Sequence, residues 1–444
     1  MNLELYSETV KRVSTVVAEA VLQIEPDIAK SPLLVDGIVR HVVQQVGLHT
    51  TAKVLNTLAD HAVAAAREQG FFMDELREVE ITTVFGSVAV SSPRMRTGRG
   101  RRLTCRPVAD QLGLTAKART PAVERALVDF GAEESFGKAA KRFEEHYGFE
   151  YGRTSVLRIV HEHAAQAEKF VAAKLAKAEV EYDKPLVERP GVPLLFGGVD
   201  GHMLRTGKLE ATNDGRQSAV RKLPKRKRET SWRETRVATV HPAGEVDATY
   251  VAGMESYPVI CKKLFGAACH RGLSDASLFV CTADGGNGLR DEVEATFVKR
   301  KFVLDKMHVV QHLSEGADAM GKSGDDKRAW LAANVSRISK GDVSKVIAEL
   351  RRHDGNGKEE ARVLANYLHK FRACVHYDAY AQRGWPIGSG RTESAHRSVS
   401  QERMKLPGTW WAPESINRMM ALRVLRENGW WKEYWDQAEK VAAA

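Results

Sequence analysis

The sequence lacks a cysteine framework and a long apolar run, and we expect no secretory leader. Its five cysteines form no Cys-x-x-Cys pair, which argues against a disulfide scaffold and against a zinc ribbon. Cys261 and Cys269 have the helical spacing of core residues rather than that of a metal half-site. No run of about 18 apolar residues occurs, so we expect no transmembrane helix. The N-terminal segment carries acids among its apolar residues, which indicates a cytoplasmic protein.

What the sequence does have is length and positive charge. A chain of 444 residues with 43% hydrophobic and 28% charged residues is typical of a soluble globular protein of two to four domains. The net charge of +10 is concentrated in two segments: residues 94–106 contain six arginines, and residues 216–236 contain nine Lys or Arg against two Glu. Basic clusters attract polyanions, usually nucleic acid, although a solvated loop has the same composition.

The N-terminal part is predicted to be mainly helical. Apolar periodicity predicts helices over residues 1–75 and again over 108–183, with a β-hairpin between them that turns at Phe85-Gly86-Ser87. The segments SFGKAAKRFEEHYG and RTSVLRIVHEHAAQAEKF are joined by a turn from Gly148 to Gly152. This is the pattern of a helix-turn-helix that reads DNA, and equally of an ordinary helical hairpin.

From about residue 190 the pattern changes to strands. Three strands in hairpin order precede a helix–strand–helix–strand series, which predicts an α/β layout with a mixed sheet, as in the ribonuclease-H-like fold. The basic segment 205–230 is long for the turn between two strands. Residues 320–384 are predicted to be entirely helical, and they separate the last strand from the final helices. We interpret them as an insertion.

Two aspartates stand out in the α/β part. Asp200 follows the apolar run VPLLFGGV and precedes Gly201, and Asp284 follows ASLFVCTA and precedes Gly285-Gly286. We expect each aspartate to end its strand. Phosphodiester cleavage by divalent metal ions requires carboxylate ligands exposed at one sheet edge. An acid after a buried strand is also a common turn former, but two in one sheet favour a shared site.

A third acid, Glu393, lies in the first turn of a predicted helix. Helical spacing places Glu393, His396 and Arg397 on one face, although the helix dipole favours an acid at that position in any protein. Asp305 ends another strand, and His308 follows one turn later. His308 is interpreted either as a structural hydrogen-bonding residue or as one that positions a phosphate. His308, Asp305, Arg397 and His396 are therefore accessory candidates.

Several short motifs occur in a fixed order. Asp-Gly at 200–201 is followed by Ala-Asp-Gly-Gly at 283–286, Leu-Asp-x-x-His at 304–308 and Gly-Ser-Gly-x-x-Glu-Ser at 388–394. Arg-Met-Lys, Gly-Thr-Trp-Trp and Asn-Gly-Trp segments come after them. The combination resembles the DDE transposases of bacterial insertion sequences, and within them the Kra-type family. The resemblance covers residues 190–440 well and the N-terminal third more loosely.

The resemblance implies a metal-dependent enzyme. Asp200, Asp284 and Glu393 would be catalytic and would together bind Mg²⁺ or Mn²⁺, with two ions expected. The implied domains are a helical N-terminal region (1–75), a basic β-hairpin (76–107), a helix-turn-helix-like DNA-binding region (108–185), a ribonuclease-H-like catalytic domain (186–319 with 385–444) and a helical insertion (320–384).

The implied activity is transposition. The protein would bind double-stranded DNA at the terminal inverted repeats and at the target, cleave and transfer strands, and act as at least a dimer. It would work in the cytoplasm on the nucleoid, with no membrane partner. A ribonuclease-H-like nuclease or resolvase without strand transfer, or a non-catalytic transposase-derived DNA-binding protein, are the alternatives. No His/Cys spacing supports a zinc hydrolase.

Candidate DNA contacts come from the basic clusters, the second helix of the helix-turn-helix and the Arg-Met-Lys segment. They are Arg94, Arg96, Arg99, Arg101, Arg102, Arg153, Lys222, Lys225, Arg226, Lys227, Arg228, Arg403 and Lys405. Trp385 and Trp410 are the candidates for stacking on unpaired bases. Most of the other C-terminal tryptophans are expected in the core.

Overall fold

The computed structural model describes residues 3–98, 103–115, 118–182, 191–211, 226–286 and 288–442. The chain divides into two compact units. Unit 1 comprises residues 1–131 and 135–159, and unit 2 comprises residues 132–134 and 160–444. None of the helices within the described ranges combines the length and the apolar character needed to span a membrane.

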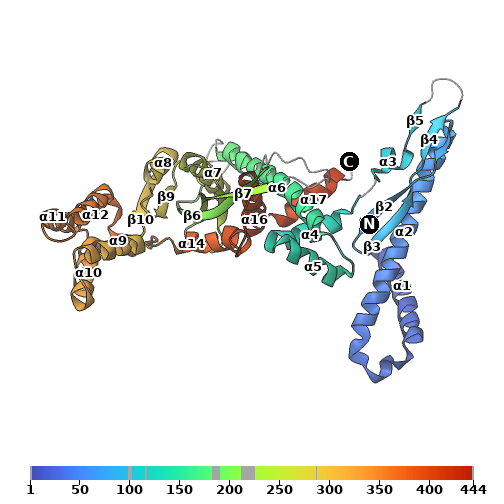
Figure 1. The fold of residues 1–444 in the computed structure, drawn as a ribbon, viewed down its shortest axis with the longest axis horizontal. Coiled ribbons are helices and arrows are strands. Elements are labelled where there is room, and N and C mark those ends of the chain that lie inside the picture. Colours follow the sequence, from blue (N-terminus) through green and yellow to red (C-terminus); the bar gives the residue numbers. More distant parts are fainter. Residues whose placement is uncertain are drawn as a thin grey trace, which may run out of the picture. The chain divides into compact units, whose positions relative to one another are not determined.

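Unit 1 starts with a long helical hairpin and continues into two small sheets (Figure 1). The predicted turn is present, because β2 and β3 pair antiparallel up to Thr83 and Gly86. Its elements are α1 (Leu3–Ile24), α2 (Val35–Glu68), β1 (Phe71–Glu75), β2 (Glu78–Thr83), β3 (Gly86–Ser91), β4 (Arg94–Thr97), β5 (Thr104–Cys105), α3 (Pro107–Leu112), α4 (Pro121–Glu133) and α5 (Phe136–Tyr147). Two short 3₁₀ turns, Pro26–Lys30 and Pro32–Leu34, join α1 to α2.

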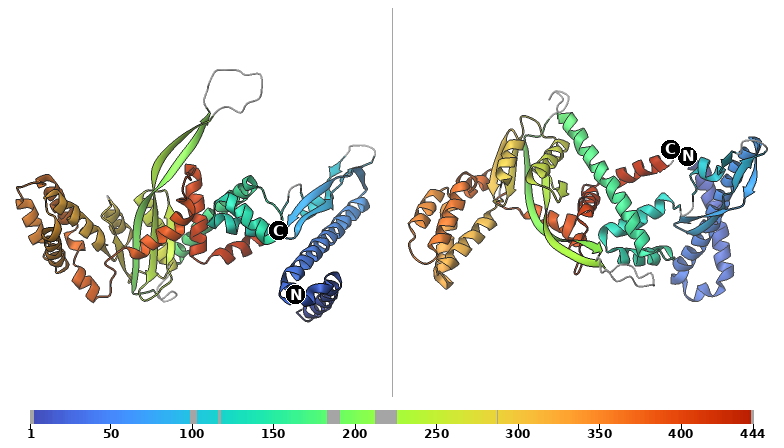
Figure 2. Two further views of the ribbon diagram at one scale, coloured as in Figure 1. Left: turned by 60° about the horizontal axis from the view of Figure 1, so that its bottom comes forward. Right: turned by 45° about the horizontal axis from the view of Figure 1, so that its top comes forward.

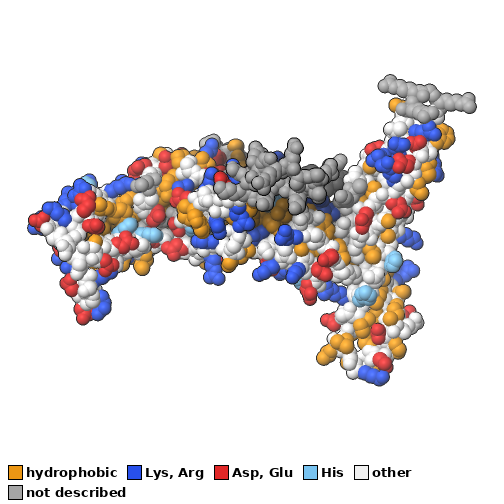
Figure 3. Space-filling model, in the orientation of Figure 1, with side chains coloured by type: hydrophobic (Ala, Val, Ile, Leu, Met, Phe, Trp, Pro, Cys, Tyr) orange, Lys and Arg blue, Asp and Glu red, His pale blue; other side chains and the backbone are white. Residues whose placement is uncertain are grey.

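The core of unit 1 lies under the second half of α2. Buried side chains of that half, including Ala59 and Val63, pack with Ile81, Val90 and Met95 of the strands. The remainder of the helical hairpin buries little. Figure 3 shows hydrophobic side chains at the surface along α1 and α2, and Tyr6, Val10, Val13 and Val43 are each between 46% and 56% exposed.

The two helices predicted around the Gly148–Gly152 turn are α5 and α6 (Arg153–Tyr182). Ser135 caps α5 by accepting a hydrogen bond from the Lys138 N–H at 3.4 Å, and Gly148 ends it in the left-handed conformation, with φ of 76°. The helix pair is therefore confirmed. Its role in reading base edges stays a prediction.

Unit 2 is built on a five-stranded mixed sheet. Its strands are β6 (Leu194–Ala211), β7 (Arg226–Pro242), β8 (Thr249–Gly253), β9 (Leu278–Ala283) and β10 (Arg300–Leu304). They lie in the order β8-β7-β6-β9-β10, with β6, β9 and β10 parallel to one another and β7 antiparallel to both β6 and β8. Numbered by occurrence, this order is 3-2-1-4-5, the ribonuclease-H-like arrangement. The predicted fold class is confirmed.

Helices follow the strands as the periodicity predicts. They are α7 (Tyr257–His270), α8 (Leu289–Thr296), α9 (Lys306–Ala319), α10 (Gly324–Ser339), α11 (Val343–Arg352), α12 (Lys358–Lys370), α13 (Tyr377–Gln382), α14 (Gly390–His396), α15 (Glu402–Met404), α16 (Pro413–Glu427) and α17 (Trp431–Ala442). A π-helical turn, Arg397–Gln401, joins α14 to α15. The segment 320–384 is helical as predicted. Pro413 opens α16 at the position where a missing N–H costs nothing.

The prediction that Asp200 ends its strand is wrong. β6 continues to Ala211, and its pairing with β7 runs without interruption from Leu195↔Pro242 to Ala211↔Arg226. The apolar run stops at Asp200 because only the first part of β6 is covered on both faces. A hairpin that leaves the sheet needs no further apolar residues to keep its ladder. The described parts of the segment 205–230 are therefore strand rather than loop (Figure 2).

Residues expected in the core are found there. Cys261 and Cys269 are buried on α7, and Trp411, Trp430 and Trp435 are at most 7% exposed. Burial raises the pKa of the Cys261 thiol to about 12. This thiol stays protonated near neutral pH and behaves as a small apolar side chain.

Candidate active site

Strand register places three aspartates at one level. The parallel β6–β9 pairing runs to Gly197↔Cys281, and Asp200 and Asp284 each lie three residues further along. The parallel β9–β10 pairing ends at Ala283↔Leu304, so Asp284 and Asp305 are the next residues on those two chains. Because parallel strands advance at the same rise, the three residues emerge at the same edge of the sheet.

Asp200 has two identified neighbours. Its Oδ1 accepts a hydrogen bond from the Gly201 N–H at 2.7 Å, and its Oδ2 lies 3.3 Å from His396 Nε2 on α14. Burial by itself would raise the pKa of Asp200, but the hydrogen bond and the charge of His396 outweigh it and lower the pKa below its ordinary value. Asp200 is therefore held as a carboxylate.

A second histidine supports the first. His396 Nδ1 lies 2.8 Å from His202 Nδ1, and His202 Nε2 lies 3.2 Å from Ser400 Oγ. Burial, followed by the charge of His396, lowers the pKa of His202 to about 4, so His202 is neutral near pH 7. Sequence reasoning missed His202. The signal was its position two residues after Asp200, which puts both side chains on one face of the strand.

Asp284 has the opposite character. Burial raises its pKa, the nearby Asp200 and Asp305 raise it further, and a hydrogen bond from the Gly286 N–H at 3.1 Å together with the charge of His308 only partly compensates. The ionised carboxylate is thus under-stabilised by the protein.

Two tyrosines flank Asp284. A Cβ added at Gly286 would lie 2.5 Å from Tyr257 Oη, and one added at Gly285 would lie 2.8 Å from the Tyr367 ring, so a side chain at either position would displace a tyrosine. Burial raises the pKa of both tyrosines, and the charge of Asp284 adds to this. Tyr367 belongs to α12, so a helix of the 320–384 segment reaches this site. The sequence carries no signal for either tyrosine.

Asp305 is a structural link. Its side chain is buried, caps α9 by accepting from the His308 N–H at 3.0 Å, and also accepts from the Ser389 N–H. Ser389 Oγ in turn donates to Glu393 Oε1 at 2.8 Å. The aspartate therefore ties the end of β10 to the segment that opens α14.

Glu393 lies in the first turn of α14 and is exposed. Its helix packs against β6 at Gly198, where a Cβ would come within 2.3 Å of Thr392 Oγ1. In the described part of the chain, no group of three or more His, Cys, Asp or Glu side chains is arranged to hold a metal ion. The Asp200–Asp284 pair nevertheless fits a divalent cation, because it offers hard oxygen donors and an under-stabilised negative charge.

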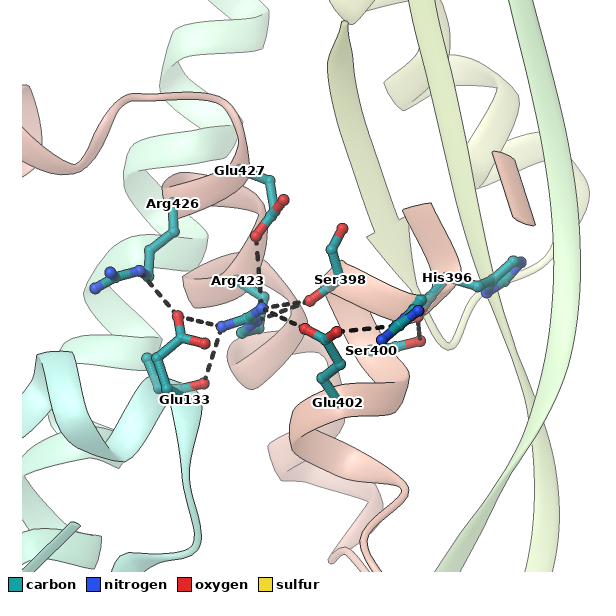
Figure 4. A network of polar contacts seen from close by, with 10 residues as sticks. Glu133, His396, Ser398, Ser400, Glu402, Arg423, Arg426 and Glu427 are labelled. Atoms are coloured by element: carbon teal, nitrogen blue, oxygen red, sulfur yellow. Dashed lines mark hydrogen bonds and ion pairs between the residues drawn. The ribbon is translucent and has the colours of Figure 1, made fainter. Parts of the chain in front are cut away.

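The helix that carries Glu393 is anchored by Arg423 of α16 (Figure 4). The Arg423 side chain is 2% exposed, its Nε donates to the Ser398 carbonyl at 3.0 Å, and it pairs with Glu133 and with Glu427. Ser398 lies in the π-helical turn, where the regular i to i−4 bonding is interrupted and a carbonyl is free for a side chain. Arg423 thereby holds the turn that follows the Glu393 and His396 helix.

The predicted DNA contacts have different environments. Arg94 and Arg96 both pair with Asp74, so part of their charge is compensated within unit 1. Arg153 and Lys405 are exposed, whereas Arg397 pairs with Glu402 at 3.1 Å. The backbones of Arg226 and Lys227 belong to β7, with Arg228 next to them. The positions outside the described residues are Arg99, Arg101, Arg102, Lys222 and Lys225.

Arg403 is a correction. It was predicted to contact DNA, but its side chain is 2% exposed and its guanidinium lies 5.0 Å from the centre of the Trp411 ring. Burial lowers its pKa to about 10. The helical turn of α15 places it inward, so it is inaccessible to a phosphate. Of the two stacking candidates, Trp385 packs on Tyr380 and Trp410 packs over Gly207.

Comparisons with known proteins show a distant likeness to solved structures. No family model matches the chain, and no curated protein matches it. Among solved structures, the chain resembles one in the Drosophila P element transposase strand transfer complex, with 10% sequence identity, 74% of this chain and 84% of that chain covered, and a TM-score of 0.25. The assignment of the fold rests on the strand order and not on this likeness.

Replacing Arg423 by Leu should lower the free energy of unfolding of unit 2 by on the order of 3 kcal/mol, because several partners lose a buried cation. Replacing Arg426 by Leu should lower the free energy of unfolding much less, because Arg426, which also pairs with Glu133, is 28% exposed. All eight tryptophans lie between Trp232 and Trp435, so tryptophan fluorescence during urea unfolding reports on unit 2. Equal losses for the two variants would refute the anchoring role.

The two aspartates should respond oppositely to neutralisation. The pKa of Asp284 is raised, so its negative charge destabilises the fold at any pH above that pKa. The pKa of Asp200 is lowered, so its negative charge stabilises the fold above about pH 4. That stabilisation is lost as the pH falls through the lowered pKa. At pH 7 with a chelator present, Asp284→Asn should raise the Tm and Asp200→Asn should lower it. Shifts of the same sign, measured by thermal unfolding, would contradict these electrostatics.

Proposed function

We propose that this protein is a DDE-type DNA transposase that binds transposon-end DNA and catalyses metal-dependent strand cleavage and strand transfer. The observation that carries the proposal is the placement of Asp200 and Asp284 at one level on adjacent parallel strands of a ribonuclease-H-like sheet. One of these carboxylates is stabilised by His396 and the other is under-stabilised. The order of motifs in the sequence adds the resemblance to transposases.

Glu393 is the proposed third carboxylate. Its neighbour Thr392 lies against β6 at Gly198, and His396, one helical turn later, lies 3.3 Å from the Asp200 carboxylate. The helix therefore touches the Asp200 strand at both of these points. Asp200, Asp284 and Glu393 would hold Mg²⁺ or Mn²⁺, which when bound supplies Lewis-acid activation of the phosphodiester.

The chain's own residues prepare this site in three ways. His396 and His202 would orient Asp200 from one side, and Tyr257 and Tyr367, which lie beside the two glycines after Asp284, would limit the access of water to it. His308 is near enough to both aspartates to lower the pKa of each.

Phosphate contacts would come from basic residues that the structure leaves accessible. Arg228 and Lys405 belong to unit 2 and Arg153 to unit 1, and all three are exposed. DNA affinity should accordingly fall with salt concentration. Because both ends of a mobile element must be processed together, we propose that the protein acts as at least a dimer on double-stranded DNA.

The central prediction concerns Asp284. The DNA that borders the coding region serves as substrate, and Asp284→Ala should reduce both strand cleavage and strand joining by about a thousandfold or more, because a metal-binding carboxylate is lost. Binding of the same DNA should change little. Gel assays of cleaved and joined products, with a filter-binding measurement in parallel, separate the two effects.

Asp291→Ala is the matched control, since Asp291 is an exposed aspartate on α8 and should be dispensable. Wild-type activity in Asp284→Ala would refute the site. Metal-dependent nicking without joining in the natural protein would identify a nuclease or resolvase. Binding of the DNA with no cleavage in any divalent metal would identify a non-catalytic DNA-binding protein.

A further inference from the structure

The β6–β7 hairpin has two faces that the register defines. Residues directly opposite in an antiparallel pair project to the same face, and successive pairs alternate. Arg205 pairs with Trp232, and Leu209 pairs with Arg228, so these four side chains share one face. Leu204 with Arg233 and Lys208 with Glu229 lie on the other face. We call the first the tryptophan face.

Trp232 is presented to solvent on the tryptophan face. Its side chain is 58% exposed, and the exposed Arg205 lies directly across the ladder from it. An indole with this much solvent-exposed surface is not part of a hydrophobic core. The two arms also run out beyond the other strands of the sheet (Figure 2), so the face stays open.

A second indole is brought to the same face from a distant part of the chain. Trp410 packs over Gly207, where a Cβ would come within 2.8 Å of its ring, and the Arg228 guanidinium lies 5.3 Å from the ring centre. The backbone fixes this arrangement: the Gly207 N–H donates to the Trp411 carbonyl at 2.9 Å, and the Trp411 N–H donates to the Arg205 carbonyl at 3.0 Å. Glycine at 207 is what lets the indole lie against the ribbon.

The charge of the tryptophan face is positive. Arg205 and Arg228 are its cations, and Glu234, its acid among the described hairpin residues, pairs with Arg236. The rungs of Trp232 and Gly207 are two residues apart, roughly 7 Å along the ribbon. This is on the order of the rise of two nucleotides. Two aromatic surfaces with two arginines at that spacing match a short stretch of nucleic acid.

We propose that the tryptophan face, formed by Trp232, Arg205, Trp410 and Arg228, binds unpaired DNA nucleotides by base stacking. The proposal rests on the proposed function, in which DNA is the substrate. A ribbon that reads a duplex through its major groove needs polar side chains aimed at base edges. Besides its two arginines, this face carries indoles and the apolar Leu209, which suit stacking on the faces of unpaired bases.

The test measures the affinity of the full-length protein for two labelled probes, a single-stranded oligothymidine and a duplex of equal length, by fluorescence anisotropy. Trp232→Ala should weaken single-strand binding by about 5- to 100-fold and duplex binding far less. Trp232→Phe should restore most of the loss, whereas Trp232→Leu should not. Because Trp232 is exposed, these variants should keep the natural Tm.

Arg205→Ala and Arg233→Ala form a matched pair, because both arginines are exposed but lie on opposite faces of the hairpin. Arg205→Ala should reduce single-strand affinity more. Equal losses for the pair would overturn the proposal. So would rescue by leucine, equal weakening of duplex and single-strand binding, or a Trp232→Ala effect on oligomeric state alone.

Failure of this proposal is distinguishable from failure of the proposed function. Unchanged single-strand affinity in Trp232→Ala, with natural cleavage and joining, would refute the stacking site alone. The unmodified protein could also bind single strands without cleaving or joining DNA. If Trp232→Ala then abolished the single-strand binding, the result would support the stacking site and refute the transposase.

Discussion

Parallel pairing of β6, β9 and β10 is the constraint on which the candidate site depends. The shared rise of the three strands delivers Asp200, Asp284 and Asp305 to one edge at one level. Three carboxylates in that position repel one another, and the structure resolves the repulsion differently at each. Asp200 faces a histidine, Asp305 is satisfied by backbone N–H groups, and Asp284 keeps a raised pKa. Asp284 is therefore the aspartate of the three whose ionised form the protein stabilises least.

The second requirement is that α14 be held against this edge. Gly198 permits close contact with Thr392, and His396 reaches Asp200. Arg423 secures the following turn through the carbonyl of Ser398, which the π-helical geometry leaves free. A buried guanidinium with several partners is a rigid connection, because removing any one of them leaves a polar group unsatisfied. Arg423 of α16 thus helps to position α14, the seven-residue helix that carries Glu393.

The long hairpin extends the site in another direction. Asp200 and Arg205 belong to the same strand, and the five residue steps between them span about 17 Å. The ladder with β7 and the short pairing with Trp411 stiffen this connection. The hairpin is therefore connected to the carboxylate edge by continuous backbone hydrogen bonding rather than by a loop.

Most of the helices, the succession of strands along the chain and the choice of Asp200 and Asp284 as candidate site residues could be predicted from the sequence. Those features follow from local hydrophobic periodicity and from two apolar runs that are each followed by an aspartate and a glycine. The sequence did not predict that β6 continues past Asp200, because strand length there depends on a partner strand and not on apolar residues. The tertiary structure alone brought His202 against His396, Tyr367 beside Asp284, and Trp410 over Gly207. It also turned Arg403 inward. Such contacts join residues that are far apart in sequence, and their distances are set by packing that no local pattern encodes.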